Sequence, residues 1–145
     1  MKKKKIISLI LALAMVLGMS QIVSASSGGG DIAVPYYNYM TSCAASIGAA
    51  GTELTLTGRV NTYDTCVVKI QLDAQKSPTG SEDSWVTFRN FPTVTVSSGT
   101  VRTALKTIAS VPTGYYYRTA ANISIYVNDV LVESETVYSN SLRIP

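Results

Sequence analysis

The sequence predicts an all-β protein, an antiparallel sandwich of about seven strands, from three observations. After residue 33 no segment shows the 3.6-residue apolar period of a helix. Val, Ile, Thr, Tyr and Ser dominate this part of the chain, and turn-forming residues recur at short intervals. Residues 65–75 and 115–127 alternate between apolar and polar side chains, which indicates strands with one buried face.

Polar and glycine-containing turns separate the strands. The strands are expected at residues 39–47, 53–60, 65–75, 84–91, 100–109, 115–127 and 130–138. The first ends at the turn Gly48-Ala49-Ala50-Gly51, and the second ends at the polar turn 61–64. In the third, the clearest strand, the buried face is expected to carry Cys66, Val68, Ile70, Leu72 and Ala74.

Proline and a tight hairpin delimit the later strands. The loop 76–83 contains Pro78 and therefore cannot be a central strand. Pro92 ends the fourth strand, and residues 93–98 either extend it or form a bulged connection to the fifth. Asn128-Asp129 is typical of the two-residue turn that joins two antiparallel strands, here the sixth and seventh.

The first 25 residues have the composition of a secretory signal peptide. Four lysines, Lys2 to Lys5, precede an apolar run from Ile6 to Leu17, and Val23-Ser24-Ala25 provides a small-residue cleavage site. The apolar run is shorter than the ~20 residues that a membrane span needs. The expected organisation is a helical signal peptide at 1–25, a flexible leader at 26–35 and a β-sandwich domain at 36–145. We therefore expect a secreted product, cleaved near Ala25, with no membrane span; the alternative is an uncleaved N-terminal anchor.

The charge of the exported part is close to zero. The whole chain has 12 basic and 9 acidic residues, and 4 of the basic residues lie in the predicted signal peptide. The remaining 8 basic and 9 acidic residues give a net charge of −1. A balanced surface gives no electrostatic reason to expect nucleic acid or anionic lipid as a partner.

Two cysteines, Cys43 and Cys66, lie in the predicted exported part. An even number of cysteines in an oxidising compartment favours a disulfide. Strand alternation directs both side chains into the core, as a disulfide requires. We expect this bond to form; the alternative is a pair of buried thiols.

The absence of histidine excludes several kinds of catalysis. Without histidine the chain has no Ser-His or Cys-His pair and no histidine zinc site. The exported lysines, Lys69, Lys76 and Lys106, are expected to face solvent or lie in loops, where none becomes a general base. No glycine-rich loop joins a strand to a helix, so a phosphate cradle is absent. We expect no enzyme activity, no catalytic residue, no cofactor and no metal.

Two carboxylate pairs are the remaining chemical candidates. Glu133 and Glu135 lie two residues apart on one strand, a spacing compatible with a glycosidase pair, but a solvated strand face is the preferred interpretation. Glu82 and Asp83 offer oxygen ligands for calcium, yet their spacing matches no known calcium loop and a polar turn is preferred.

Tyrosine is the better functional clue, because the chain has 9 tyrosines against 2 phenylalanines. A tyrosine ring combines a flat apolar face with a hydroxyl, which suits contacts with sugars or proteins. Tyr36, Tyr37, Tyr116 and Tyr126 are expected to be exposed and are the candidate ligand-binding residues. Tyr117 is expected to face inward as a corner residue that locks the sandwich.

Several motifs occur in an order that resembles a known group of proteins. They are Pro35-Tyr36-Tyr37-Asn38-Tyr39, Cys43-Ala44-Ala45-Ser46-Ile47, Leu72-Asp73-Ala74-Gln75-Lys76, Trp85-Val86, Gly114-Tyr115-Tyr116-Tyr117-Arg118 and the segment 133–140. With the signal peptide, this order resembles small secreted proteins of clostridia-type Gram-positive bacteria, a domain family of unknown function. The resemblance implies an extracellular, immunoglobulin-like sandwich, and it brings no catalytic residues.

The sequence therefore favours a secreted, non-enzymatic binding or interaction module. Its ligand is unknown and could be a cell-surface component, a glycan or a protein. One alternative is a self-associating structural or toxin-like secreted factor, because amphipathic strands can pair edge to edge. The other is a hydrolase that acts through Glu133 and Glu135.

Overall fold

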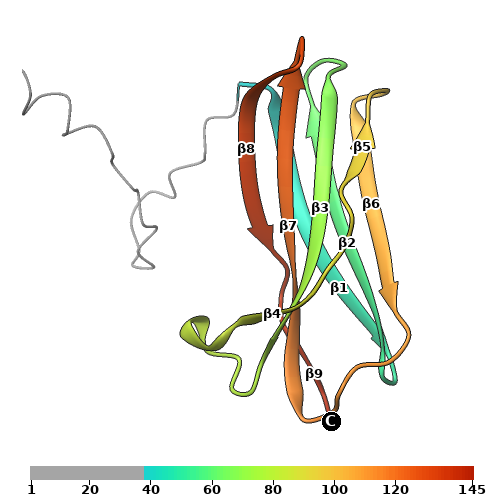
Figure 1. Ribbon diagram of the computed structural model, residues 1–145, viewed down its shortest axis with the longest axis vertical. Coiled ribbons are helices and arrows are strands. Elements are labelled where there is room, and N and C mark those ends of the chain that lie inside the picture. Colours follow the sequence, from blue (N-terminus) through green and yellow to red (C-terminus); the bar gives the residue numbers. More distant parts are fainter. Residues whose placement is uncertain (1–37) are drawn as a thin grey trace, which may run out of the picture. The chain divides into compact units, whose positions relative to one another are not determined.

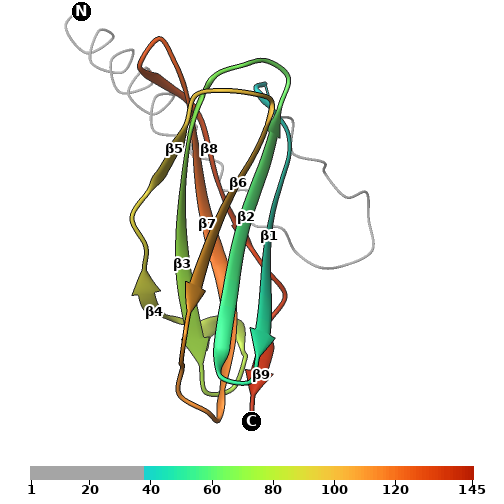
Figure 2. The same ribbon diagram turned by 90° about the vertical axis from the view of Figure 1, so that its right-hand side faces the viewer.

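In the computed structural model, the described part of the chain consists of two antiparallel sheets (Figures 1 and 2). The structure describes residues 38–145. The predicted signal peptide, its cleavage site, the leader and the candidate residues Tyr36 and Tyr37 lie outside the described residues.

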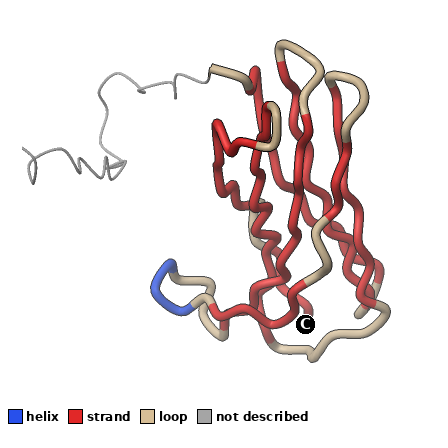
Figure 3. Tube along the Cα trace, turned by 45° about the horizontal axis from the view of Figure 1, so that its top comes forward, coloured by secondary structure: helices blue, strands red, loops and turns tan. Residues whose placement is uncertain are grey.

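Sheet A has three strands, and sheet B is built on a four-strand path. Sheet A has the order β1 (Met40–Ala50), β2 (Glu53–Thr62) and β6 (Val101–Ile108). Sheet B has the order β4 (Val86–Asn90), β3 (Val67–Ser77), β7 (Tyr115–Val127) and β8 (Val130–Tyr138). Two short strands complete sheet B: β5 (Val94–Val96) pairs with β3, and β9 (Leu142–Ile144) pairs with β7. A short 3-10 helix, η1 (Glu82–Ser84), interrupts the loop between β3 and β4 (blue in Figure 3).

The connections are those of an immunoglobulin-like sandwich, which confirms the predicted fold class. Hairpins join β1 to β2 and β7 to β8, whereas the chain crosses between the sheets after β2, β5 and β6. The β7–β8 turn uses Asn128 and Asp129, with φ of 51° and 64°. This left-handed backbone is the conformation that a two-residue hairpin turn requires, and Asn and Asp tolerate it well.

The predicted strands agree closely with the observed ones. The sixth and seventh have the predicted bounds, while the third runs from 67 to 77 instead of from 65 to 75. The sequence did not predict β9, and it left open whether residues 93–98, which contain β5, form a strand. Three-residue strands are too short to show a recognisable alternation, so their pairing depends on a neighbouring long strand.

The core fills the space between the two sheets. Burial alternates along β2 and β3, so every second side chain enters the core. The aliphatic residues at its centre are Leu54, Leu56, Val60, Val68, Ile70, Leu72, Ile123 and Ile125, all at most 1% exposed. Because β3 and β7 supply most of these side chains, their opposite faces point outward as one rigid surface.

Tyr117 is the corner residue that the sequence predicted. Its side chain is fully buried at the start of β7, and its hydroxyl donates a 2.6 Å hydrogen bond to the carbonyl oxygen of Pro112. The ring meets Phe88 edge to face, with 6.0 Å between centroids and 73° between planes. The bond ties β7 to the chain that enters it from sheet A, as in other Greek-key sandwiches.

The buried Tyr117 is expected to make the fold less stable above about pH 10. Burial raises the pKa of its phenol, and the nearby Tyr115 raises it further. The unfolded chain releases the Tyr117 proton near pH 10, whereas the folded protein keeps this proton to a higher pH. The free energy of unfolding is therefore unaffected below about pH 10 and decreases as the pH rises toward the pKa of the folded state. Urea unfolding at pH 8 and at pH 11 measures how much the free energy of unfolding falls between the two pH values. This decrease should be smaller for Tyr117→Phe than for the wild type. An equal loss in both proteins would contradict the assignment.

The predicted disulfide is absent from the structure. Cys43 and Cys66 both pack against the core, as expected, but no bond joins them. Cys43 lies on β1, which packs against β7 and β8, whereas the carbonyl of Cys66 accepts a 2.9 Å hydrogen bond from Arg102 on β6. Cys43 therefore belongs to an edge strand of sheet A, whereas Cys66 lies in the connection between β2 of sheet A and β3 of sheet B. Strand alternation gives the direction of a side chain but not its position across the sheet.

Candidate functional site

The outer face of sheet B brings together the two described candidates, Tyr116 and Tyr126. Both occupy outward positions of β7, because Tyr117, Ile123 and Ile125 on the same strand point into the core. The outward side chains of β3 and β8 and the ring of Trp85 complete this surface, which we call the outer face of sheet B.

Arg118 organises one end of this face. Its guanidinium carbon lies 4.4 Å from the ring centroid of Trp85 and 4.3 Å from that of Tyr138. Arg118 is itself only 8% exposed, so both cation–π contacts form largely out of water. The result is a stack that joins the residue before β4, the beginning of β7 and the end of β8.

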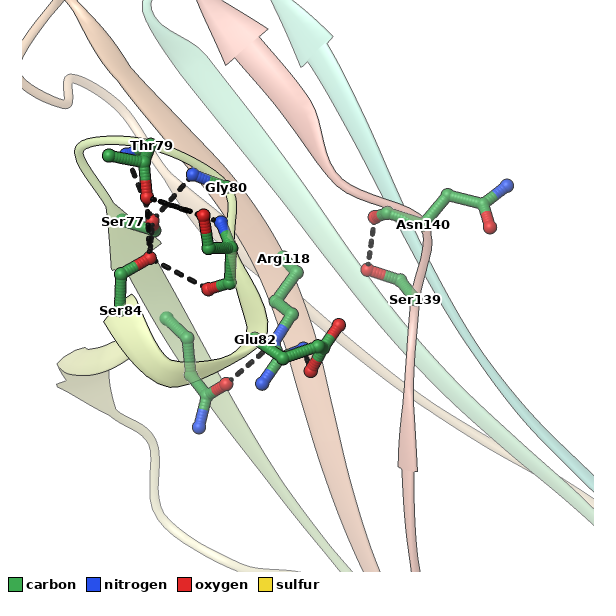
Figure 4. Close-up of polar contacts among 10 residues, drawn as sticks. Ser77, Thr79, Gly80, Glu82, Ser84, Arg118, Ser139 and Asn140 are labelled. Atoms are coloured by element: carbon green, nitrogen blue, oxygen red, sulfur yellow. Dashed lines mark hydrogen bonds and ion pairs between the residues drawn. The ribbon is translucent and has the colours of Figure 1, made fainter. Parts of the chain in front are cut away.

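Polar contacts fix the same guanidinium from the side. Arg118 Nε donates a 2.8 Å hydrogen bond to Gln75 Oε1, and Nη1 lies 3.0 Å from Glu82 Oε2 (Figure 4). The Glu82 side chain is 88% exposed, so solvent screens this ion pair and it contributes little stability. The aromatic rings and Gln75 therefore account for most of the ordering of Arg118.

Hydroxyl groups shape the loop that carries Glu82 and Trp85. Ser77 Oγ accepts hydrogen bonds from the backbone N–H of Gly80 at 2.7 Å and of Thr79 at 3.2 Å (Figure 4). Ser84 Oγ donates a 2.7 Å bond to the carbonyl of Ser81 and shares a second hydrogen bond with Ser77. These local bonds favour a compact turn and place Glu82 beside Arg118.

The calcium interpretation of Glu82 and Asp83 gains no support from this arrangement. Glu82 pairs with Arg118, and within residues 38–145 no three acidic or cysteine side chains group as metal ligands.

Neither described tyrosine candidate is fully exposed, which corrects the sequence-based expectation. Tyr116 is half-buried beneath the β3–β4 loop, and a Cβ added to Gly80 would lie 3.3 Å from its Cγ. Tyr126 is also half-buried, with the Lys69 ammonium 4.3 Å from its ring centroid. Alternation along β7 correctly placed both tyrosines on the outer face, but it could not show that the β3–β4 loop and Lys69 partly cover their rings.

A row of polar side chains crosses all four long strands of sheet B. Asp73 Oδ1 accepts a 2.9 Å hydrogen bond from Asn90 Nδ2, and Asp73 Oδ2 accepts a 3.1 Å bond from Asn122 Nδ2. Thr136 Oγ1 donates a 2.8 Å bond to Asn122 Oδ1. These bonds hold Asn122 in one orientation on the outer face.

Next to this row lies a shallow hollow over β7 and β8, with a volume of about 350 Å³. Its lining residues are Asn122, Ile123, Ser124, Ser134, Glu135 and Thr136. The hollow exists because Ser124 and Ser134 face each other across the two strands and are small. Tyr138 and Tyr126 follow the hollow at its two ends, each two residues along its own strand from a lining residue.

Glu133 and Glu135 do not form the solvated face that the sequence suggested. Their register partners, Ile125 and Ile123, point into the core, so both carboxylates lie half-buried on the inner side of β8. Glu133 Oε2 accepts hydrogen bonds of 3.0 Å from the N–H groups of Tyr39 and Met40, and Oε1 accepts one of 3.3 Å from Asn38. Glu133 therefore anchors the chain that enters β1.

Glu133→Ala is expected to lower the free energy of unfolding by about 2 kcal/mol, because three N–H groups lose a charged acceptor. Glu135→Ala is the matched control and is expected to cost about 0.5 kcal/mol or less, because no hydrogen bond involves its side chain within residues 38–145. Urea unfolding of both variants measures the difference, and equal costs would refute the anchoring role.

The sequence analysis missed Trp85, Arg118 and Tyr138 as members of the site. The alternation that directs Tyr117 inward also directs Arg118 outward beside Tyr116, so this position was accessible from the pattern. Tyr138 and Trp85 come from other strands, and only the register of β7 with β8 and the loop before β4 bring them to Arg118.

No protein-family model matches the chain, and no curated protein is significantly similar to it. Across residues 38–145, the chain forms no helix that is long and apolar enough to cross a membrane.

Proposed function

We propose that this protein is a secreted, non-enzymatic binding module whose extracellular ligand lies on the outer face of sheet B. The polar hollow between Tyr126 and Tyr138 carries this proposal. Rigid sheet strands position its polar groups, and aromatic rings stand at both ends, a combination typical of recognition surfaces. Export rests on the composition of residues 1–25 and on the resemblance to small secreted proteins.

A non-enzymatic role agrees with the chemistry of the chain. The sequence contains no histidine, and the carboxylate of Glu133 is occupied by three backbone N–H groups. A glycosidase needs a carboxylate that can exchange a proton with substrate or attack it. The Glu133–Glu135 pair therefore offers a poor starting point for hydrolysis.

Two edge strands favour ligand binding over self-association. The half-buried Lys106 points inward from β6, and the half-buried Glu133 and Glu135 point inward from β8. Inward-pointing charges at an edge oppose the addition of a further strand, because pairing would bury them. These two edges of the sandwich are thus protected against edge-to-edge pairing.

The test is co-sedimentation of the purified chain with intact Gram-positive cells. Saturable binding is expected, and Tyr138→Ala is expected to weaken it by about tenfold or more because the aromatic contact at one end of the hollow is lost. Tyr63→Ala is the matched control, since this tyrosine is 63% exposed and follows β2 in sheet A. No saturable binding, or an equal loss in both variants, would reject the proposal.

A further inference from the structure

We propose that the ligand of this face is a neutral glycan chain with adjacent free hydroxyls, bound along the hollow between Tyr126 and Tyr138. The inference rests on the proposed function and specifies the ligand class for the same site.

The shape of the surface suits a chain better than a single small molecule. The hollow is shallow, and Ser124 and Ser134 lie directly opposite each other in its lining. Tyr138 pairs with Ala120, and Tyr126 lies six residues further along β7. At about 3.3 Å per residue, the two aromatic positions are about 20 Å apart along the strand. An extended polymer can contact both ends, whereas a monosaccharide contacts only one.

The polar groups of the face match a ligand rich in hydroxyls. Within residues 38–145 the side chains of Ser124 and Ser134, and that of Gln71, which lies opposite Asn122 on β3, make no hydrogen bond, so they remain available to a ligand. A serine hydroxyl both donates and accepts, as a sugar hydroxyl does. Ser124 and Ser134 are directly opposite in register, which presents two such groups side by side to adjacent sugar hydroxyls. Asn122 is already oriented by Asp73 and Thr136, so binding does not have to order it.

The tyrosine rings are complementary to the apolar side of a sugar ring. One side of a pyranose ring exposes C–H groups, which pack on an aromatic face, while the hydroxyls project from its rim. Tyr138 is 52% exposed and is held in place by the Arg118 guanidinium 4.3 Å from its ring centroid. Lys69 holds Tyr126 in a similar way at the other end of the hollow.

The charge of the face argues for a neutral ligand. Lys69 and Arg118 are balanced by Asp73 and Glu82, Arg118 is paired directly with Glu82, and Arg143 beside Tyr116 adds one further cation. A polyanion such as nucleic acid or a phosphate-rich wall polymer is bound through many cations in one patch, and one extra positive charge does not make such a patch.

The test compares intact Gram-positive cells with the same cells after periodate or after protease. Periodate cleaves the carbon–carbon bond between adjacent hydroxyl-bearing carbons and so destroys the proposed ligand. We expect periodate to weaken binding by about tenfold or more, and protease to change it by less than about twofold. Raising NaCl from 0.05 to 0.5 M should change the affinity by less than about threefold, because few counterions are released.

Two variants connect this result to the hollow. Ser134→Gln fills part of the hollow and is expected to weaken binding by about tenfold. Thr103→Gln, at an exposed position of β6 in sheet A, is the matched control and should bind as the wild type does. Circular dichroism establishes that both variants are folded.

The outcomes separate the two proposals. If Tyr138→Ala abolishes binding but protease also abolishes it, the ligand is a protein; the glycan inference then fails and the proposed function stands. Binding that resists periodate, or that is lost at 0.5 M NaCl, likewise overturns the neutral glycan. If the cells bind no protein at all, both proposals fail.

Discussion

Gly58→Val is expected to lower the free energy of unfolding by about 3 kcal/mol or more, a large share of a typical domain's total. Gly58 lies in the middle of β2 and faces the other sheet. Among the glycines of residues 38–145, an added Cβ would come nearest to neighbouring atoms at this position. A Cβ at this position would lie 2.7 Å from Leu72 Cδ2, 3.1 Å from Ala121 Cβ and 3.2 Å from Ile70 Cγ2. The Leu72 methyl can rotate away, but the Ala121 Cβ is fixed to the backbone of β7 and cannot.

Gly48→Val is the matched control for this prediction. Gly48 lies on the neighbouring strand β1, and an added Cβ meets nothing within 4 Å. Valine favours strands, so this substitution is expected to change stability by less than about 0.5 kcal/mol or to raise it slightly. Urea unfolding measures both variants. Equal urea midpoints for the two variants would mean that the sheets can move apart at Gly58 without a loss of stability.

Arg118→Ala is expected to lower the free energy of unfolding by about 2–4 kcal/mol and to abolish ligand binding. The substitution removes two stacked contacts, with Trp85 and Tyr138, and the hydrogen bond to Gln75. It also leaves the ring of Tyr138 without the group that holds it against the sheet. Binding should therefore decrease even at temperatures where the variant remains folded.

Arg143→Ala provides the control for Arg118. Arg143 is exposed on β9 and lies 5.9 Å from the ring centroid of Tyr116, a longer and more solvated contact. Its loss is expected to cost about 0.5 kcal/mol or less. Arg118→Lys distinguishes the contribution of the positive charge from that of the planar guanidinium, because lysine keeps the charge but cannot stack as a plane on the two rings. If the lysine variant binds normally, charge alone accounts for the role of Arg118.

The candidate site was partly accessible from the sequence. Alternation along residues 115–127 placed Tyr116 and Tyr126 on one face and Tyr117 on the other, and the position of Tyr117 near the start of its strand identified it as a corner residue. The degree of exposure was not accessible, because Gly80 comes from a distant loop and Lys69 from another strand. Cross-strand neighbours depend on register, which a single strand pattern does not contain.

Two expectations about side-chain placement failed because alternation describes one strand at a time and not how the strands pack together. Cys43 and Cys66 were assigned to the core side correctly, yet no bond joins them: Cys43 lies on β1 of sheet A, and Cys66 lies in the connection that leads into β3 of sheet B. Glu133 and Glu135 were assigned to one face correctly, but that face points toward β1 and not toward solvent. A period of two divides the residues of a strand into two sets, and only packing decides which set is buried.

The sequence by itself determined the all-β class, the long strands, the β7–β8 hairpin and the inward position of Tyr117, because these depend on local alternation and turn chemistry. Only the tertiary structure decided the order of strands in the sheets, the stack of Trp85, Arg118 and Tyr138, and the hollow between β7 and β8. These features join residues far apart in the chain. Their energies arise from contacts between strands and from the exclusion of water, and no local pattern of side chains records either.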